Sequence, residues 1–66
     1  MTQLVIDTIK LLKTNIYSSD LKEAYEAECQ IFINFSKMSG QEIHDYRFEA
    51  YKIKDYKKVF EETVNN

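Results

Sequence analysis

The residues with the most potential for chemistry surround the single histidine of the chain. Glu42, Asp45 and Glu49 lie close to His44 in the sequence and could offer carboxylate ligands beside an imidazole. On a helix, however, His44 and Asp45 would point about 100° apart, and no second histidine or cysteine stands one turn away to complete a zinc site. The sequence therefore predicts no metal centre and no cofactor.

Nucleophilic catalysis is not expected either. Neither Ser36 nor Cys29 has a histidine within helical reach to act as its general base. Acid and base pairs on one short helix would also lack a pocket, so we expect no enzymatic activity. Because Cys29 is the only cysteine, it cannot form an intramolecular disulfide. We expect it to be a small buried apolar residue in a reducing compartment.

A basic strip towards the end of the chain is the remaining candidate for recognition chemistry. Arg47, Lys54 and Lys58 would share one strip of a helix, with Tyr51 and Tyr56 beside them, as in a surface that follows a phosphate backbone. The same segment also contains the acidic residues Glu49, Asp55, Glu61 and Glu62. The formal net charge is -2, whereas nucleic-acid binders carry a clearly basic face. We therefore expect a solvated flank and no nucleic-acid binding.

Helices should carry these residues, because the 66 residues include no proline and one glycine. The apolar spacing predicts a single all-α domain over residues 1–66. It consists of a short N-terminal helix over residues 2–14 and two longer helices over 20–38 and 41–63. The connection between the longer helices is very short, so we expect them to lie side by side as an antiparallel hairpin. The first helix would then cover part of a second seam.

Local signals mark where the longer helices begin. Ser19 or Asp20 is the expected N-cap of the second helix. Before the third helix, either Gly40 turns the chain with a positive φ, or Ser39 caps the helix together with Glu42. The second helix should bury one broad apolar face, which contains Leu21, Ala24, Tyr25, Ile31, Phe32 and Phe35 and is interrupted by Glu28.

The third helical segment is apolar on two opposite sides. Its core stripe should contain Ile43, Tyr46, Ala50, Ile53, Phe60 and Val64. Phe48, Tyr51 and Val59 group on the other side, where a solvated helix would carry charge. A chain of this size buries only about 60% of its unfolded surface and cannot cover both sides. We therefore predict that a protein partner contacts Phe48, Tyr51 and Val59, together with Leu4 and Ile9 of the first helix.

The amino-terminal segment carries no targeting signal that we recognise. Met1 to Lys13 holds an apolar cluster, but Asp7 and Lys10 interrupt it and no small-residue cleavage site follows. The cluster is also too short and too polar to span a bilayer. We expect neither a signal peptide nor a membrane span, and a cytoplasmic location.

With these residues placed, the chain resembles the small E-protein family of type III secretion systems, which includes YscE- and PscE-like proteins. The resemblance covers nearly the full length. It lies in the Met1 to Leu4 opening, the Ala27 to Gln30 run, the turn at Gly40, and the aromatic pair Tyr46 and Phe48. It also includes the apolar spacing of Ile53, Tyr56 and Phe60.

This resemblance implies a cytoplasmic co-chaperone in protein transport and virulence. Members of that family bind a tetratricopeptide-like (TPR-like) chaperone, and the two together keep the needle subunit monomeric before export. A helix with two apolar faces could complete such a helical-repeat partner by adding a layer to its stack. When alone, the chain could hide its apolar surface as a homodimer.

The residues leave a second hypothesis open. A small inhibitory or antitoxin-like protein, of the kind that phages encode, could self-associate and block a target protein. Two hairpins joined as a four-helix bundle would satisfy the same pattern of two apolar faces.

Overall fold

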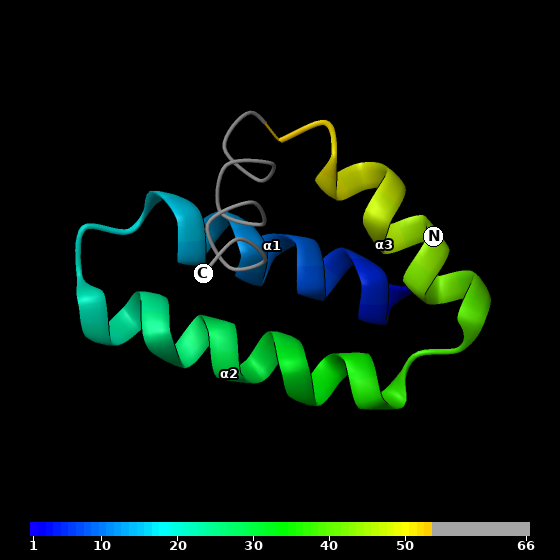
Figure 1. Ribbon diagram of the computed structural model, residues 1–66, viewed down its shortest axis with the longest axis horizontal. Helices are drawn as coiled ribbons and strands as arrows, with labels where there is room; N and C mark the ends of the chain where they lie inside the picture. Colours follow the sequence, from blue (N-terminus) through cyan, green and yellow to red (C-terminus); the bar gives the residue numbers. More distant parts are fainter. Residues whose placement is uncertain (54–66) are drawn as a thin grey trace, which may run out of the picture.

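The computed structural model describes residues 1–53, and these residues are all-helical (Figure 1). The helices are α1 (Gln3–Tyr17), α2 (Leu21–Lys37) and α3 (Gly40–Ala50). The all-α prediction is confirmed. Among the described residues, no helix combines the length and the apolar character that crossing a membrane requires.

Each helix begins at a side chain that accepts hydrogen bonds from free backbone N–H groups. Thr2 caps α1 by accepting from the N–H of Val5, and Asp20 caps α2 by accepting from two N–H groups of its first turn. Ser39 caps α3 in a reciprocal capping box with Glu42. The glycine at position 40 has no positive φ, so the serine cap is the correct one of the two alternatives.

The helices pack around α1 (Figure 1). α1 and α2 run antiparallel along one another, and α1 also contacts α3 on its other side. An antiparallel hairpin is therefore present, but α1 and α2 form its main seam, whereas we expected the second and third helices to form it. The connection between α1 and α2, from Ser18 to Asp20, is nearly as short as the one between α2 and α3. The length of the connections alone therefore could not predict which two helices form the main seam.

The apolar core joins all three helices. Its buried members are Val5, Leu12, Ala27, Ile31, Tyr46 and Ala50. The rings of Phe35 on α2 and Tyr46 on α3 meet edge to face, with centroids 5.0 Å apart and planes at 78°. Tyr46 and Ala50 confirm part of the stripe predicted for the third helix, and Ile53 packs against the same core at partial exposure. The predicted core residues Phe60 and Val64 lie outside the described residues.

The prediction for the buried face of α2 is wrong for its largest side chains. Leu21, Tyr25 and Phe32 are exposed, and α2 buries Ala27, Ile31 and Asn34 against its neighbours. A small side chain such as alanine allows two helices to approach closely, while an aromatic ring at the same contact would hold them apart. The expected burial of Cys29 is also wrong, because this thiol is exposed.

A buried polar contact accompanies this orientation of α2. Asn34 Nδ2 donates to Thr8 Oγ1 at 3.0 Å, and Thr8 Oγ1 donates to the backbone oxygen of Leu4 at 2.7 Å. Asn34 Oδ1 accepts from Gln30 Nε2 at 3.1 Å. Thr8 is fully buried and Asn34 nearly so. A buried amide is costly unless it is paired, so this face of α2 can pack inward because Asn34 bonds to Thr8; the apolar residues on its opposite side then face outward.

The ends of two helices differ from the prediction. α1 continues to Tyr17, beyond the expected end at residue 14, and α3 ends at Ala50, well before residue 63. After α3, the N–H groups of Lys52 and Ile53 donate to Glu49 and Ala50, three residues back, at 3.1 and 3.0 Å. This tighter bonding closes the helix in a turn without any glycine or proline to signal it. Residues 54–63 of the expected helix lie outside the described residues.

Glu42 links the beginnings of α1 and α3. Its Oε2 accepts a hydrogen bond from Thr2 Oγ1 at 2.7 Å, and its Oε1 accepts from the N–H of Ser39 at 3.1 Å. These hydrogen bonds lower the pKa of the Glu42 carboxyl below its usual value. The bond from Thr2 has the largest effect, and Ser39 adds to it. One carboxylate therefore ties the N-cap of α1 to the N-cap of α3.

The Thr8–Asn34 contact should contribute measurably to stability. We expect Asn34→Ala to lower the free energy of unfolding by about 1–3 kcal/mol, because it removes a buried hydrogen bond between helices. Urea denaturation would measure this loss. The matched control is Gln30→Ala, on the exposed side of the same network, with a change within about 0.5 kcal/mol. Equal effects of the two variants would contradict the importance of the buried bond.

Stability should also depend on pH through Glu42. Since its pKa is lowered in the folded state, its stabilisation is fully present above the unfolded pKa of about 4.3. It is lost as the pH falls through the lower folded value. The difference in melting temperature between the natural chain and Glu42→Gln should therefore be present at neutral pH and disappear in acid. Glu26→Gln, at an exposed position of α2, controls for loss of charge; a constant difference at all pH values for Glu42→Gln would refute this linkage.

Candidate functional site

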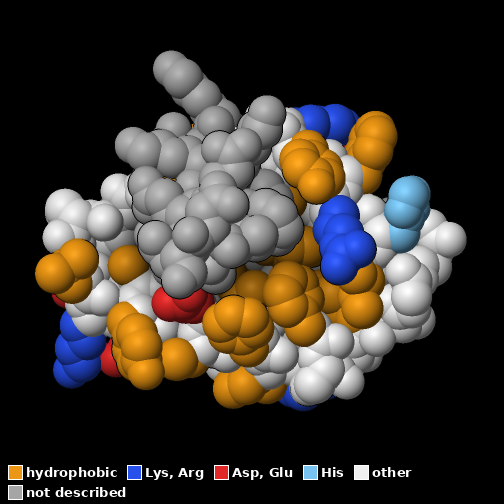
Figure 2. Space-filling model, viewed as in Figure 1, with side chains coloured by type: hydrophobic (Ala, Val, Ile, Leu, Met, Phe, Trp, Pro, Cys, Tyr) orange, Lys and Arg blue, Asp and Glu red, His pale blue; other side chains and the backbone are white. Residues whose placement is uncertain are grey.

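Large apolar side chains gather on two exposed surfaces of the described residues. We define the α2 seam as Leu21, Tyr25, Cys29, Phe32 and Ile33, and the α3 patch as Phe48 and Tyr51. Leu21 is 84% exposed, and both residues of the α3 patch are at least 60% exposed. Figure 2 shows hydrophobic side chains along α2 and continuing towards α3. Contiguous apolar surface of this kind typically marks an interaction site.

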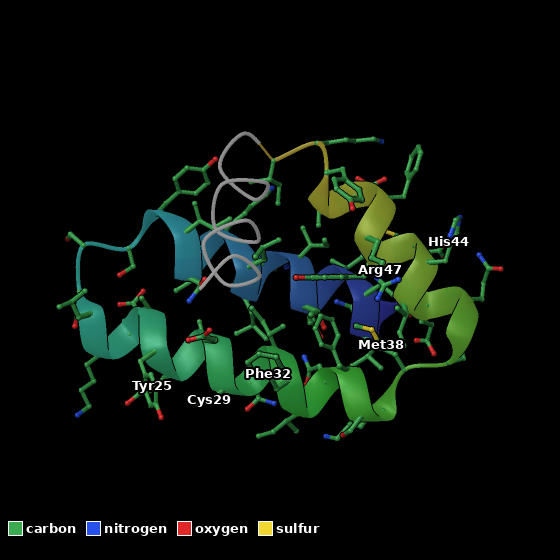
Figure 3. All side chains as sticks on the ribbon, in the orientation of Figure 1. Tyr25, Cys29, Phe32, Met38, His44 and Arg47 are labelled. Carbon is green, nitrogen blue, oxygen red and sulfur yellow. The ribbon has the colours of Figure 1, made fainter. Side chains whose placement is uncertain are left out.

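The α2 seam follows the repeat of the helix. Its five residues fall within about 120° of one another at 100° per residue. Figure 3 shows Tyr25, Cys29 and Phe32 in order along α2. Phe32 also meets Phe35 edge to face at 6.2 Å, so the seam continues into the aromatic edge of the core. The seam is therefore a continuous strip from the beginning of α2 towards α3.

The polar atoms of the seam interact with one another. The neighbouring Cys29 side chain, chiefly as a hydrogen-bond partner, raises the pKa of Tyr25 above its usual value, and desolvation and the Glu28 charge add smaller contributions. A phenol is protonated at neutral pH even without this shift. It can donate a hydrogen bond at the edge of an otherwise apolar surface.

The α3 patch is partly shielded by a cation. Lys52 Nζ lies 4.6 Å from the centroid of the Phe48 ring, and it also pairs with Glu49 Oε1 at 3.2 Å. A lysine held in this way covers part of an aromatic face while keeping its charge in water. Because both contacts are exposed and weak, a partner could displace the lysine stem and reach the ring.

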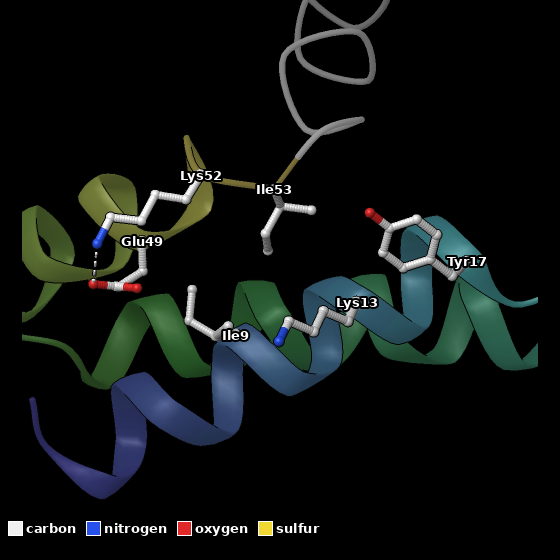
Figure 4. Close-up of a pocket in the computed structure, with 6 residues that line it drawn as sticks. All are labelled: Ile9, Lys13, Tyr17, Glu49, Lys52 and Ile53. Carbon is white, nitrogen blue, oxygen red and sulfur yellow. Dashed lines mark hydrogen bonds and ion pairs between the residues drawn. The ribbon is translucent and has the colours of Figure 1, made fainter.

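A groove separates α1 from the end of α3 (Figure 4). Ile9, Lys13 and Tyr17 face Glu49, Lys52 and Ile53 across a hollow of about 430 Å³. Apolar side chains come from both helices, and charged groups lie among them. The groove adjoins the α3 patch through the Glu49–Lys52 pair, which lines the groove and also carries the contact to Phe48.

Of the predicted partner-binding residues, the structure brings some together. Phe48 and Tyr51 are exposed on α3, and Ile9 lies in the adjoining groove. Leu4 instead lines a different hollow, formed by α1 and α2. Val59 lies outside the described residues. The predicted set therefore does not form one surface over residues 1–53, because Leu4 and Ile9 lie at opposite edges of α1.

The α2 seam was not predicted from the sequence. Leu21, Tyr25 and Phe32 share a helical face, and such a face was assigned to the core. Glu28 was the available signal, because a carboxylate on that face is difficult to bury. Its side chain is exposed, as are those of Tyr25 and Cys29 beside it.

Histidine, cysteine, aspartate and glutamate side chains are distributed over residues 1–53. No group of three or more histidine, cysteine, aspartate or glutamate side chains in this part of the chain could hold a metal ion. His44 is exposed and points away from the other helices (Figure 3). These residues form a small helical protein whose distinguishing feature is exposed apolar surface.

Compared with known protein families, curated proteins and solved structures, the chain shows no match. Its resemblance to the secretion E proteins therefore stays a prediction drawn from its residues.

Truncation of the exposed rings should leave the fold almost unchanged. Phe32→Ala and Phe48→Ala should each alter the free energy of unfolding by less than about 1 kcal/mol, since both side chains lie mainly in water. Tyr46→Ala should cost about 3–5 kcal/mol, because this ring is buried in the core. Thermal or urea denaturation would compare them. Losses at Phe32 or Phe48 as large as at Tyr46 would show that these rings serve the fold itself.

Proposed function

We propose that this chain is a protein-binding module. The observation that carries the proposal is the exposure of large apolar side chains on two helices of a small domain, on the α2 seam and on the α3 patch. Leaving such side chains in water forgoes the burial energy that a domain of this size needs. A partner that covers them would recover that energy as binding energy.

The α3 patch is the proposed site for a helical partner. Phe48 and Tyr51 lie at the end of α3, beside a groove that ends at Ile53. An aromatic anchor next to a hollow suits a helix that inserts its own apolar residues between α1 and α3. Charged residues around the groove, Lys13, Glu49 and Lys52, would supply the polar rim typical of protein interfaces.

Within this class, we propose a TPR-like secretion chaperone as the partner and the cytoplasm as the location. The resemblance of the sequence to the secretion E proteins supports this proposal. A helix with an exposed apolar face could also pack on the open end of a helical-repeat stack. In that role the chain would stabilise the chaperone, and the two together would hold a needle subunit monomeric before export.

The second candidate is the small self-associating inhibitor. The α2 seam favours it, because this seam is a second apolar surface separate from the α3 patch. The neighbouring genes distinguish the two candidates: secretion genes support the co-chaperone, and phage or toxin genes support the inhibitor.

Substitution of the α3 patch should weaken binding to the partner. The full chain would be co-expressed with a candidate TPR-like chaperone, purified as a complex, and its affinity measured by calorimetry. We expect Phe48→Ala and Tyr51→Ala each to cost about 1–4 kcal/mol of binding free energy, as anchors buried at an interface do.

Lys10→Ala is the control, since this exposed side chain lines the separate hollow between α1 and α2, away from the α3 patch. It should change the affinity little. A complex unaffected by both aromatic substitutions would place the interface elsewhere. If no candidate chaperone forms a complex stable to gel filtration, the co-chaperone proposal is wrong.

A further inference from the structure

We propose that the α2 seam is the docking site for a second copy of this chain, with the two α2 helices antiparallel about a two-fold axis close to Cys29. This proposal goes beyond the function of the α3 patch and does not depend on which partner that patch binds. It follows from the pattern, the area and the central residues of the seam.

The seam is nearly symmetric about its own middle. Tyr25 and Phe32 are equally far from the point between Glu28 and Cys29. When two copies meet antiparallel at this point, Tyr25 of one copy lies beside Phe32 of the other, and the same contact repeats on the opposite side of the axis. A two-fold interface requires this self-complementarity, whereas an unrelated partner would not require it.

The area of the seam is sufficient for a weak, specific dimer. An aromatic side chain can bury roughly 150–250 Å², and Tyr25 and Phe32 are 66% and 62% exposed. With Leu21 and Ile33 included, each copy offers roughly 400–500 Å², so two copies together hide at most roughly 800–1,000 Å², the size of a weak, transient interface. The dimer should therefore depend strongly on both aromatic rings.

Two residues at the centre report the register. Cys29 and Glu28 both lie next to the two-fold axis, on opposite sides of the line along which the two α2 helices touch. Because the two-fold rotation keeps each residue on its own side of that line, Cys29 faces Cys29 of the second copy, and Glu28 faces Glu28 of the second copy. Because aromatic rings lie in the contact, the helix axes would be at the wide end of the usual 8–10 Å, and the two Cys29 Cα atoms would be roughly 6–7 Å apart, near the upper end of the range for a disulfide. The two Glu28 carboxylates would face each other and repel, which opposes association.

Sedimentation equilibrium of the purified full chain tests the dimer. We expect a monomer–dimer equilibrium that Tyr25→Ala with Phe32→Ala weakens by about tenfold or more. Glu28→Gln should strengthen the dimer by about twofold, because it removes a like-charge pair. Phe48→Ala on the α3 patch is the control and should leave the equilibrium unchanged. Far-UV circular dichroism confirms that each variant is folded.

Oxidation with diamide tests the register. The reagent takes two electrons and two protons from a pair of Cys29 thiols, forms one disulfide and becomes the hydrazine. A cross-linked dimer should appear quickly on a non-reducing gel and should be suppressed by the Tyr25 and Phe32 substitutions. Cys29→Ser should abolish the cross-link and leave the equilibrium dimer intact.

A chain that stays monomeric, including Glu28→Gln, at the highest concentrations would overturn the proposal. A dimer that resists the seam substitutions but is broken by Phe48→Ala would also overturn it, and would assign self-association to the α3 patch. A seam-dependent dimer without the Cys29 cross-link would overturn the antiparallel register. None of these outcomes requires the chaperone complex, so failure of this proposal and failure of the proposed function are distinguishable.

Discussion

The hydrogen bond between Thr8 and Asn34 is the constraint on which the surface of this protein depends. Both side chains are buried between α1 and α2. If α2 were rotated to bury Phe32 and Tyr25 against α1, Asn34 would face water, and the buried hydroxyl of Thr8 would lose the amide that now donates to it. Burial of polar groups is costly unless they are paired. The polar contact therefore favours the observed orientation of α2, in which Leu21, Tyr25 and Phe32 remain outside.

The consequence is a domain with a small core and much apolar surface. Tyr46 is its largest fully buried side chain, and most other buried residues are aliphatic or small. Aromatic rings on α2 and α3 remain largely in water. Packing within the domain does not account for this distribution, because so small a domain would be more stable if these aromatic rings were buried in its core. The proposed protein-binding role would account for it, since rings left outside the core can be buried when another chain arrives.

The helix termini make the arrangement of α1 and α3 specific. Thr2, Ser39 and Glu42 join two N-caps through hydrogen bonds that depend on one ionised carboxylate. The beginning of α3 is therefore held beside the beginning of α1, while its far end carries the α3 patch at a distance from this anchor. In this arrangement Phe48 and Lys52 lie next to the groove formed with Ile9.

Several features of this protein could be predicted from its sequence because they depend on local interactions. The three helices, the caps at Asp20 and Ser39, and the burial of Tyr46 and Ala50 follow from side chains that act within one turn or one face of a helix. Other features depended on contacts between distant residues. The sequence pattern gave no reason to pair α1 with α2, because connection lengths are similar at both turns. It also placed Leu21, Tyr25 and Phe32 in the core, since a large apolar face normally packs inward. Only the folded chain decides that rotation, because Asn34 and Thr8 are 26 positions apart and meet only after α1 and α2 have packed.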